Sequence, residues 1–290
     1  MHWQTTRYRI DLTQPRVMGI VNVTPDSFSD GGEFADARAA MAHCEALAQE
    51  GADMLDIGGE STRPGAVKPS TQAELDRVLP VLRHALTLGL PVSVDTSQAE
   101  VMRAALALGV DIVNDVRALT RPGALECVAA YPWAGVCLMH MQGEPGSMQV
   151  APHYDDVVHE VAEFLAHRMS AVEGAGLSAE RIVLDPGIGF GKSAEHNVAL
   201  LARQGELLTL GRPLLVGWSR KRTLGKITGR DVRSRQAASV AAALMAVQRG
   251  ASIVRVHDVA ATVDALKVWC AVQTSAQPAT NAHSLASQKS

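Results

Sequence analysis

Eight short apolar segments alternate with longer helical patterns along almost the whole chain, and this alternation constrains the fold more than any other feature. Each segment is continuously apolar, which is typical of a parallel strand covered on both faces. The predicted strands are residues 17–23, 54–57, 91–94, 111–113, 135–139, 181–184, 213–216 and 252–256. Eight β–α units in a row predict an α/β fold built as a single closed barrel, the (β/α)8 TIM barrel.

The segments between the predicted strands have helical patterns with recognisable ends. The predicted helices cover residues 36–50, 71–88, 97–108, 155–173, 193–203, 233–249 and 258–272, with the least regular pattern over 123–130. Gly51, Gly89 and Gly109 follow three of these helices, at the position where glycine commonly ends a helix. Ser97 and Glu100 have the spacing of a capping box, which predicts a helix start at Ser97.

An open doubly wound sheet is the alternative arrangement of such units. Its dinucleotide-binding form would place a G-x-G-x-x-G motif after the first strand, whereas this strand leads into Asn22-Val23-Thr24-Pro25-Asp26. Roughly 250 residues suffice for one barrel, and the chain contains no second comparable unit. We expect one domain over residues 1–274 and a disordered tail over 275–290, which is rich in Ser, Ala and Gln.

Composition argues against several classes of function. A net charge of −3 provides no basic surface for nucleic acid, and nothing in the composition suggests a membrane surface. The N-terminal residues lack the apolar core of a secretory signal, and no run of eighteen apolar residues occurs. The cysteines stand far apart without a CxxC pair, so we expect reduced, buried thiols in a cytoplasmic protein rather than a zinc site. They are Cys44, Cys127, Cys137 and Cys270.

A polar residue stands at the C-terminal end of nearly every predicted strand. In chain order these are Asn22, Asp56, Asp95, Asn114 with Asp115, His140, Asp185, Ser219 to Lys221, and Arg255 to Asp258. Any one of them is more often a helix cap, a turn residue or a satisfied core group than a catalytic group. In a TIM barrel, however, all these positions converge on one mouth, where active sites are built. The set as a whole therefore predicts an active site at the C-terminal ends of the strands.

Long motifs occupy these strand ends. They are MGIVNVTPDSFSDGG (18–32), DIGGESTRPG (56–65), SVDTS (93–97), NDVR (114–117), LMHMQG (138–143), DPGIGFGK (185–192), GWSRK (217–221) and RVHD (255–258). Together they closely resemble the motifs of dihydropteroate synthases, in family order, over about residues 15–272. The resemblance implies an enzyme of folate biosynthesis that condenses 6-hydroxymethyl-7,8-dihydropterin diphosphate with p-aminobenzoate, giving 7,8-dihydropteroate and pyrophosphate. It also implies a homodimer.

The resemblance implies a pterin site built from both charged and apolar side chains. We expect it to consist of Asp95, Asn114, Asp185, Lys221, Met139 and Ile112. Asp185 is expected to accept two N–H bonds from the edge of the pterin ring, and Lys221 to donate to its carbonyl. Met139 and Ile112 either pack against the ring or serve barrel packing alone. Asp56 either contacts the ligand or orders the loop after it.

The leaving diphosphate needs positive charge around it. We expect Asn22, Arg255 and His257 to bind pyrophosphate, since phosphates favour the last two loops of such barrels and arginine clamps their oxygens. Mg²⁺ retains waters and often bridges phosphates, which fits a single protein oxygen from Asn22, although Asn22 alone reads as a turn residue. An aryl amine needs no strong base, so the catalytic residues act by positioning and electrostatics along a dissociative route. They are expected to be Asp95, Lys221, Arg255 and His257.

The p-aminobenzoate site is expected to include Thr62, Arg63, Pro64, Phe190 and Ser219. Its carboxylate should lie near Ser219, at the start of the seventh helix, where backbone N–H groups favour anions. Loops 24–34 and 58–68 are expected to close over it as a lid. The family commonly has Ser after Ser-Arg-Lys, whereas this chain has Arg222, which predicts altered affinity for p-aminobenzoate or sulfonamides.

Two alternatives remain at this point. A pterin-dependent methyltransferase would keep the Asp and Asn residues of the pterin site but would not need the motifs after the first, seventh and eighth strands. A catalytically silent paralogue would bind a pterin without turnover, and Arg222 keeps this possibility open.

Overall fold

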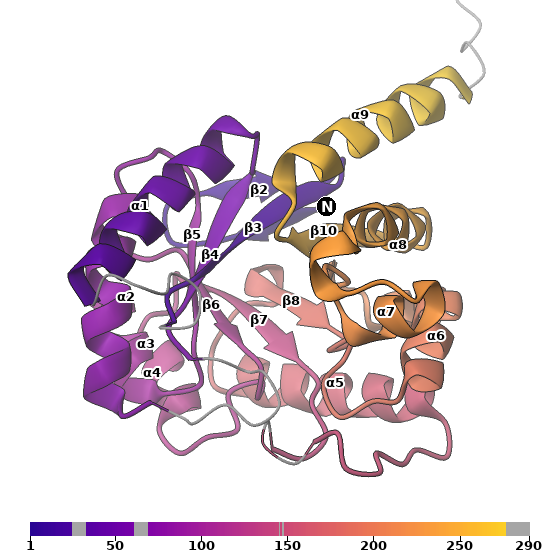
Figure 1. The fold of residues 1–290 in the computed structure, drawn as a ribbon. Coiled ribbons are helices and arrows are strands. Elements are labelled where there is room, and N and C mark those ends of the chain that lie inside the picture. The colour runs from indigo at the N-terminus through magenta and orange to yellow at the C-terminus, as the bar shows by residue number, and fades with distance from the viewer. Residues whose placement is uncertain (25–32, 61–68, 145, 147, 277–290) are drawn as a thin grey trace, which may run out of the picture.

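The computed structural model describes residues 1–24, 33–60, 69–144, 146 and 148–276. Eight parallel strands close into a barrel in the order β10-β3-β4-β5-β6-β7-β8-β9, and helices surround it (Figure 1). This confirms the predicted (β/α)8 barrel. The strands are β3 Arg16–Asn22, β4 Met54–Gly58, β5 Val92–Asp95, β6 Ile112–Asp115, β7 Gly135–Met139, β8 Ile182–Asp185, β9 Leu214–Val216 and β10 Ala251–Val256.

Alternation along the strands divides their side chains between the barrel interior and the core beneath the helices. An interior cluster contains Met18, Met54, Ile112, Cys137, Val183, Leu215 and Ile253, while neighbours such as Val17, Leu55 and Val113 belong to the outer core. Because a strand has a period of two, residues two positions further on also face the interior, one layer nearer the mouth. These residues are Asp56, Asn114, Met139, Asp185 and Arg255.

The α-helices follow the strands in the expected alternation. They are α1 Glu33–Gln49, α2 Thr71–Ala85, α3 Ala99–Ala107, α4 Ala124–Ala129, α5 Val157–Gly174, α6 Ala194–Ala202, α7 Arg222–Thr228, α8 Gln236–Gln248 and α9 Val259–Ala276. Short 3-10 segments are η2 Ala179–Arg181, η3 Gln204–Leu210 and η4 Val232–Ser234. None of the helices among the described residues is long and apolar enough to cross a membrane.

Three helix predictions need correction. The capping box at Ser97 is wrong: its hydroxyl donates to Asp115 Oδ1 at 2.5 Å, and α3 begins after Gln98. A capping box is instead present at Ser193 and His196 on α6. The predicted helix 233–249 begins only at Gln236, after the separate helix α7. Finally, α9 continues to Ala276 rather than ending at residue 272, so it enters the stretch expected to be a disordered tail.

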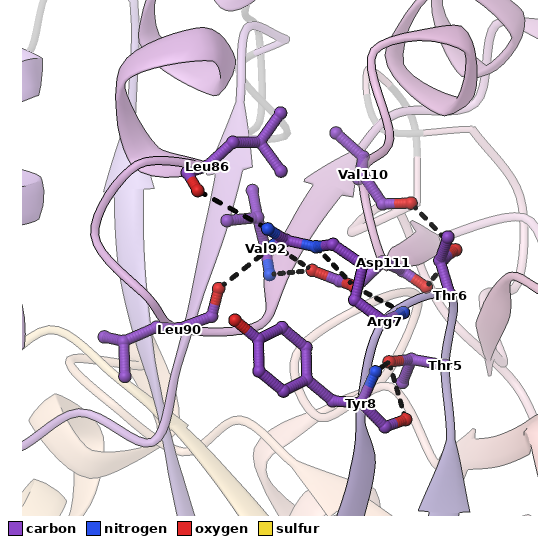
Figure 2. Close-up of polar contacts among 9 residues, drawn as sticks. All are labelled: Thr5, Thr6, Arg7, Tyr8, Leu86, Leu90, Val92, Val110 and Asp111. Carbon is purple, nitrogen blue, oxygen red and sulfur yellow. Dashed lines mark hydrogen bonds and ion pairs between the residues drawn. The ribbon is translucent and has the colours of Figure 1, made fainter.

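An N-terminal hairpin, which the sequence patterns did not predict, covers the N-terminal ends of the barrel strands. Its strands β1 His2–Gln4 and β2 Arg9–Asp11 pair antiparallel. Trp3 is fully buried against the interior cluster and donates from Nε1 to the carbonyl of Arg181 at 2.8 Å. At the turn of the hairpin, Arg7 binds the buried carboxylate of Asp111 at 2.6 Å (Figure 2).

All four cysteines are free, as expected. Cys44, Cys127 and Cys137 are buried, and burial raises the pKa of each thiol. Cys270, which was also expected to be buried, is only partly so, because α9 leaves one side of the residue to solvent. Its thiol lies 3.1 Å from Gln14 Oε1.

Candidate active site

Arg255 joins two carboxylates across the barrel mouth. Its Nε donates to Asp56 Oδ2 at 2.6 Å, and its Nη2 donates to Asp95 Oδ2 at 2.7 Å. Asn114 Nδ2 donates to the same Asp56 oxygen at 3.0 Å. Burial disfavours the guanidinium cation, but attraction to the two carboxylates outweighs this effect and raises the pKa of Arg255. The cation at this mouth is therefore permanent and held in one orientation.

Asp56 has a role that the sequence analysis did not foresee. Its side chain is fully buried, and one oxygen binds both Arg255 and Asn114. The other oxygen, Oδ1, has no hydrogen-bond partner among the described residues. Asp56 thus holds two neighbouring groups of the predicted site.

Asp185, at the end of β8, and Lys221, at the N-cap of α7 after the neighbouring strand β9, form the charged edge of the mouth. Burial raises the pKa of Asp185 to about 6, against the opposing effects of the Gly187 N–H and the cations Lys221 and Arg255. Burial also lowers the pKa of Lys221 to about 8, against the attraction of Asp185. The Asp185 carboxylate accepts the Gly187 N–H at 2.7 Å. Neutral pH therefore leaves an acceptor and a donor side by side, as a flat heterocycle with N–H and carbonyl groups requires.

The loop after Asp185 packs too closely on the segment that follows β7 for any residue but glycine at two positions. Gly187 has φ +67°, and a Cβ there would lie 1.8 Å from the carbonyl oxygen of His140. Gly191 has φ +62°, and a Cβ there would lie 2.2 Å from the Gln142 carbonyl oxygen. This close packing places Phe190 at the mouth, where Lys221 Nζ lies 4.2 Å from the centre of its ring.

Lys192 holds the loop after Asp185 in place. The sequence analysis did not predict this role, and the only sequence signal for it is that Lys192 ends the DPGIGFGK motif. Its ammonium is buried and lies 3.0 Å from the carbonyl oxygens of both Gly187 and Phe190. His140 Nδ1 is 2.8 Å from the same nitrogen. Burial and the Lys192 cation lower the pKa of His140 to about 3, so its ring is neutral and accepts this hydrogen bond. His140 is therefore a support of the loop.

Ser219 and His257 meet at the ends of β9 and β10. The Ser219 hydroxyl accepts the His257 backbone N–H at 3.1 Å and lies 2.9 Å from its Nδ1. Burial, together with Arg220 and Arg255, lowers the pKa of His257 to about 3. The helix expected to start at Ser219 begins only at Arg222, with Lys221 as its N-cap, because Arg220 adopts a left-handed backbone with φ +58°. Arg222 itself is exposed.

The structure describes three of the remaining predicted residues, Asn22, Met139 and Ile112, but not the other three. Asn22 ends β3, opposite Gly58 of β4 and partly buried. Met139 is buried at the end of β7, and Ile112 is fully buried in the interior cluster one layer below the mouth. Thr62, Arg63 and Pro64 lie outside the described residues, as do residues 25–32 and 61–68 of the two expected lid loops.

Comparison with known proteins places this chain in a family. A family model for pterin binding enzymes matches residues 18–257. The dihydropteroate synthase of Neisseria meningitidis serogroup B is 54% identical over 273 residues, covering 92% of this chain and 96% of that protein. The chain belongs to the dihydropteroate synthase family. The Escherichia coli K12 synthase is 48% identical over 260 residues, covering 89% and 92% of the two chains.

Solved structures agree with this assignment. A dihydropteroate synthase from Xanthomonas albilineans with 4-aminobenzoic acid has a TM-score of 0.87 and 57% sequence identity, covering 93% of this chain and 96% of that one. The same enzyme in complex with 7,8-dihydropteroate also has a TM-score of 0.87, with 52% identity over 96% of this chain and all of that one. The family resemblance inferred from the motifs is confirmed.

Proposed function

We propose that this protein condenses 6-hydroxymethyl-7,8-dihydropterin diphosphate with p-aminobenzoate, forming 7,8-dihydropteroate and pyrophosphate. The observation that carries the proposal is the grouping of Asp185, Lys221 and Arg255 at the mouth of a barrel whose relatives are dihydropteroate synthases. The solved Xanthomonas albilineans complexes contain 4-aminobenzoic acid or 7,8-dihydropteroate, and a Yersinia pestis complex contains a sulfonamide drug. We propose that this chain also binds p-aminobenzoate, 7,8-dihydropteroate and sulfonamides.

The pterin ring binds, in this proposal, between Asp185 and Lys221. The ionised Asp185 carboxylate accepts adjacent N–H groups of the ring, and Lys221 donates to its carbonyl. Asn114 and Asp95 contact further polar atoms of the ring, Met139 packs on its face, and Ile112 supports it from the layer below. Charge-assisted hydrogen bonds of this kind each contribute roughly 1.5–3 kcal/mol.

Arg255 and His257 bind the diphosphate. The Arg255 cation is oriented by Asp56 and Asp95, so little reorganisation is needed when negative charge develops on the leaving group. His257 is neutral and, with Nδ1 next to Ser219, its Nε2 is available to donate to phosphate oxygen. The bond between the pterin methylene carbon and the diphosphate oxygen breaks first, and the p-aminobenzoate amine then attacks that carbon and loses a proton to water.

The Asn22 side chain fits the chemistry of a magnesium ligand. It offers a neutral amide oxygen at the end of β3, and Mg²⁺ prefers oxygen ligands while retaining several waters. Among the described residues, no three or more His, Cys, Asp or Glu side chains are grouped to hold a metal. We propose that Asn22 would hold Mg²⁺ through this oxygen, as the single protein ligand that the motif resemblance suggests. When bound, Mg²⁺ would neutralise charge on the diphosphate.

We assign the p-aminobenzoate ring to Phe190 and its carboxylate to the vicinity of Ser219, and Thr62, Arg63 and Pro64 to the same substrate. Positioning dominates here, because the aryl amine is already unprotonated at neutral pH and needs no base. We also propose a cytoplasmic location, supported by the four free cysteines, which a reducing compartment preserves. Cell fractionation that recovers the protein outside the cytoplasm would exclude that location.

The function is tested by incubating the purified protein with dihydropterin diphosphate, p-aminobenzoate and Mg²⁺, and following dihydropteroate and pyrophosphate. Product should disappear with EDTA and fall by about 10²-fold or more in Asp185→Ala and Arg255→Ala. Arg9→Ala, on the exposed hairpin strand, serves as the control and should retain full activity. Calorimetric binding of the pterin without any product would instead indicate a silent paralogue, and Arg222→Ser would then be the first reversion to make.

A further inference from the structure

We propose that Asn197 on α6 is a positioning residue that holds Phe190 and Lys221 in register at the barrel mouth. It does not reach the mouth itself. It acts through two segments: it binds Gly189, which directly precedes Phe190, and Thr223, which lies two residues after Lys221. The inference rests on the proposed function, since that function assigns p-aminobenzoate to Phe190 and the pterin carbonyl to Lys221.

The Asn197 amide is buried, with 1% of the residue exposed, and both of its polar atoms are used. Oδ1 accepts the backbone N–H of Gly189 at 2.7 Å. Nδ2 donates to the Ser193 carbonyl at 2.7 Å and to the Thr223 hydroxyl at 3.1 Å. The first and last of these contacts tie together two segments that are separated in sequence, the loop at Gly189 and the first turn of α7.

The contact to Gly189 controls the residue directly before Phe190. The Gly189 carbonyl also accepts a hydrogen bond from Gln149 Nε2 at 2.7 Å, so this residue is held through both its N–H and its C=O. Gly189 has φ +84°, and a Cβ there would lie 3.1 Å from Lys221 Cδ. Its lack of a side chain therefore lets the Lys221 stem pass across the loop.

The contact to Thr223 controls the segment that carries Lys221. Thr223 is buried in the first turn of α7, two residues after Lys221, whose carbonyl accepts the Leu224 N–H at 3.1 Å. A single amide therefore links the backbone beside the aromatic ring to the backbone beside the ammonium. Because Lys221 Nζ lies 4.2 Å from the centre of the Phe190 ring, a small shift of either backbone changes this pair.

Loss of the Asn197 contacts should misalign the two substrates, because Phe190 and Lys221 are each assigned to one of them. A misplacement of about 1 Å can reduce a positioned reaction by about 10²-fold. Losing Asn197 also leaves the partly buried Gly189 N–H and the buried Thr223 hydroxyl without this partner, which loosens both segments. We expect the effect to fall mainly on p-aminobenzoate, because the pterin keeps its Asp185 contacts when Lys221 shifts, whereas Phe190 is the ring partner assigned to p-aminobenzoate.

The test is a double-mutant cycle between Asn197→Ala and Phe190→Ala, read as the KM for each substrate. Asn197→Ala should raise the KM for p-aminobenzoate by about tenfold and change that for the pterin diphosphate by less than about threefold. In the Phe190→Ala background it should add less than about twofold to the KM for p-aminobenzoate, since Phe190, the group through which it acts on that substrate, is gone. Thr223→Val, which removes one arm only, should raise the KM for p-aminobenzoate by about threefold.

Gln204→Ala is the matched control for the loss of a buried amide. Gln204 is also 1% exposed and donates to the carbonyls of Ala246 and Arg249, away from Phe190 and Lys221. It should lower the Tm without changing the KM for p-aminobenzoate. Multiplicative effects of Asn197→Ala and Phe190→Ala, or an unchanged KM in Thr223→Val, would overturn the inference. Absence of product from the wild-type protein would instead overturn the proposed function.

Discussion

At the scale of single residues, Asp185 links the structure to a measurable pH dependence. Burial raises its pKa to about 6, so the carboxylate gains a proton as the pH falls through 6 and then loses its capacity to accept two N–H bonds. Lys221, with a pKa of about 8, stays charged throughout this range. The affinity for a pterin is therefore expected to weaken on the acid side of pH 6.

This expectation can be checked by calorimetry with 6-hydroxymethylpterin, which lacks the titrating diphosphate. Burial also raises the pKa of Asp95, in the same site, to about 7, so any effect of that carboxyl falls near neutral pH. The Kd should rise by about tenfold per pH unit well below 6, where Asp185 alone still gains its proton. Asp185→Asn, which keeps the shape but cannot ionise, should bind weakly and lack this acid limb below pH 6. The same acid limb in Asp185→Asn would assign the titration to another group.

Arg222 is the second residue whose effect can be isolated. It is exposed on the first turn of α7, directly after Lys221, where the family commonly has Ser. A surface cation near the p-aminobenzoate carboxylate attracts it weakly, so Arg222→Ser should raise the KM by about two- to fivefold at low salt, with the difference shrinking at high salt. Arg230→Ser, just beyond the same helix, is the control. If wild type and Arg222→Ser have indistinguishable KM values and sulfonamide inhibition, Arg222 does not affect the affinity for p-aminobenzoate or sulfonamides.

At the scale of elements, the N-terminal hairpin closes the end of the barrel opposite the active site. Asp111 is fully buried just before β6 and accepts hydrogen bonds from the Arg7 guanidinium, the Arg7 N–H and the Val92 N–H (Figure 2). Arg7 also donates to the carbonyls of Leu86 and Leu90. The hairpin is thus joined to the barrel by a charge pair of which only the Arg7 side meets solvent.

Replacing Arg7 by Met should therefore lower stability without altering catalysis. The buried Asp111 carboxylate would lose its cation, at a cost of about 2 kcal/mol. Thermal unfolding should show a Tm lower by about 4–8 °C, with both KM values unchanged. Arg9→Met, on exposed β2, is the matched substitution and should change stability by less than about 0.5 kcal/mol. Equal Tm values for the two variants would show that the charge pair contributes nothing.

At the scale of the whole molecule, we propose that two chains associate through the side formed by α7, η4 and α8. Large apolar side chains are exposed on these neighbouring elements: Ile227 at 63%, Val232 at 51% and Met245 at 42%. Such side chains are favoured at interfaces between subunits. Helices α7 and α8 lie side by side outside the barrel strands (Figure 1).

Light scattering can test this association directly. Wild type should have the mass of two 30.7 kDa chains, and Ile227→Asp should reduce it to one. Val268→Asp, which changes an equally exposed apolar residue on α9, should leave the dimer intact. A monomeric wild type would exclude the homodimer, and dissociation by Val268→Asp alone would place the interface on α9 instead.

Local sequence was sufficient for the barrel and for most of the residues at its mouth. Continuous apolar runs mark strands buried on both faces, and the end of each run marks where a parallel strand reaches the common edge. Asp185, Asn114 and Arg255 could therefore be identified from their neighbours in the chain alone. The short hairpin strands were missed and the start of α7 was misplaced, because three to seven residues hold too little periodicity to distinguish them from loops.

The partners of these residues depended instead on closure of the barrel. Arg255 meets Asp56 across 199 positions and Asp95 across 160, and closure alone brings β10 beside β3 and near these carboxylates. Ser97 matches a helix cap in the chain, yet its hydroxyl joins the Arg117 and Leu119 N–H groups that donate to the buried Asp115 carboxylate, because a hydrogen bond to a buried charge is worth more than one helix cap. Strand positions follow from local periodicity, whereas charge pairing follows from proximity in space, which no local pattern encodes.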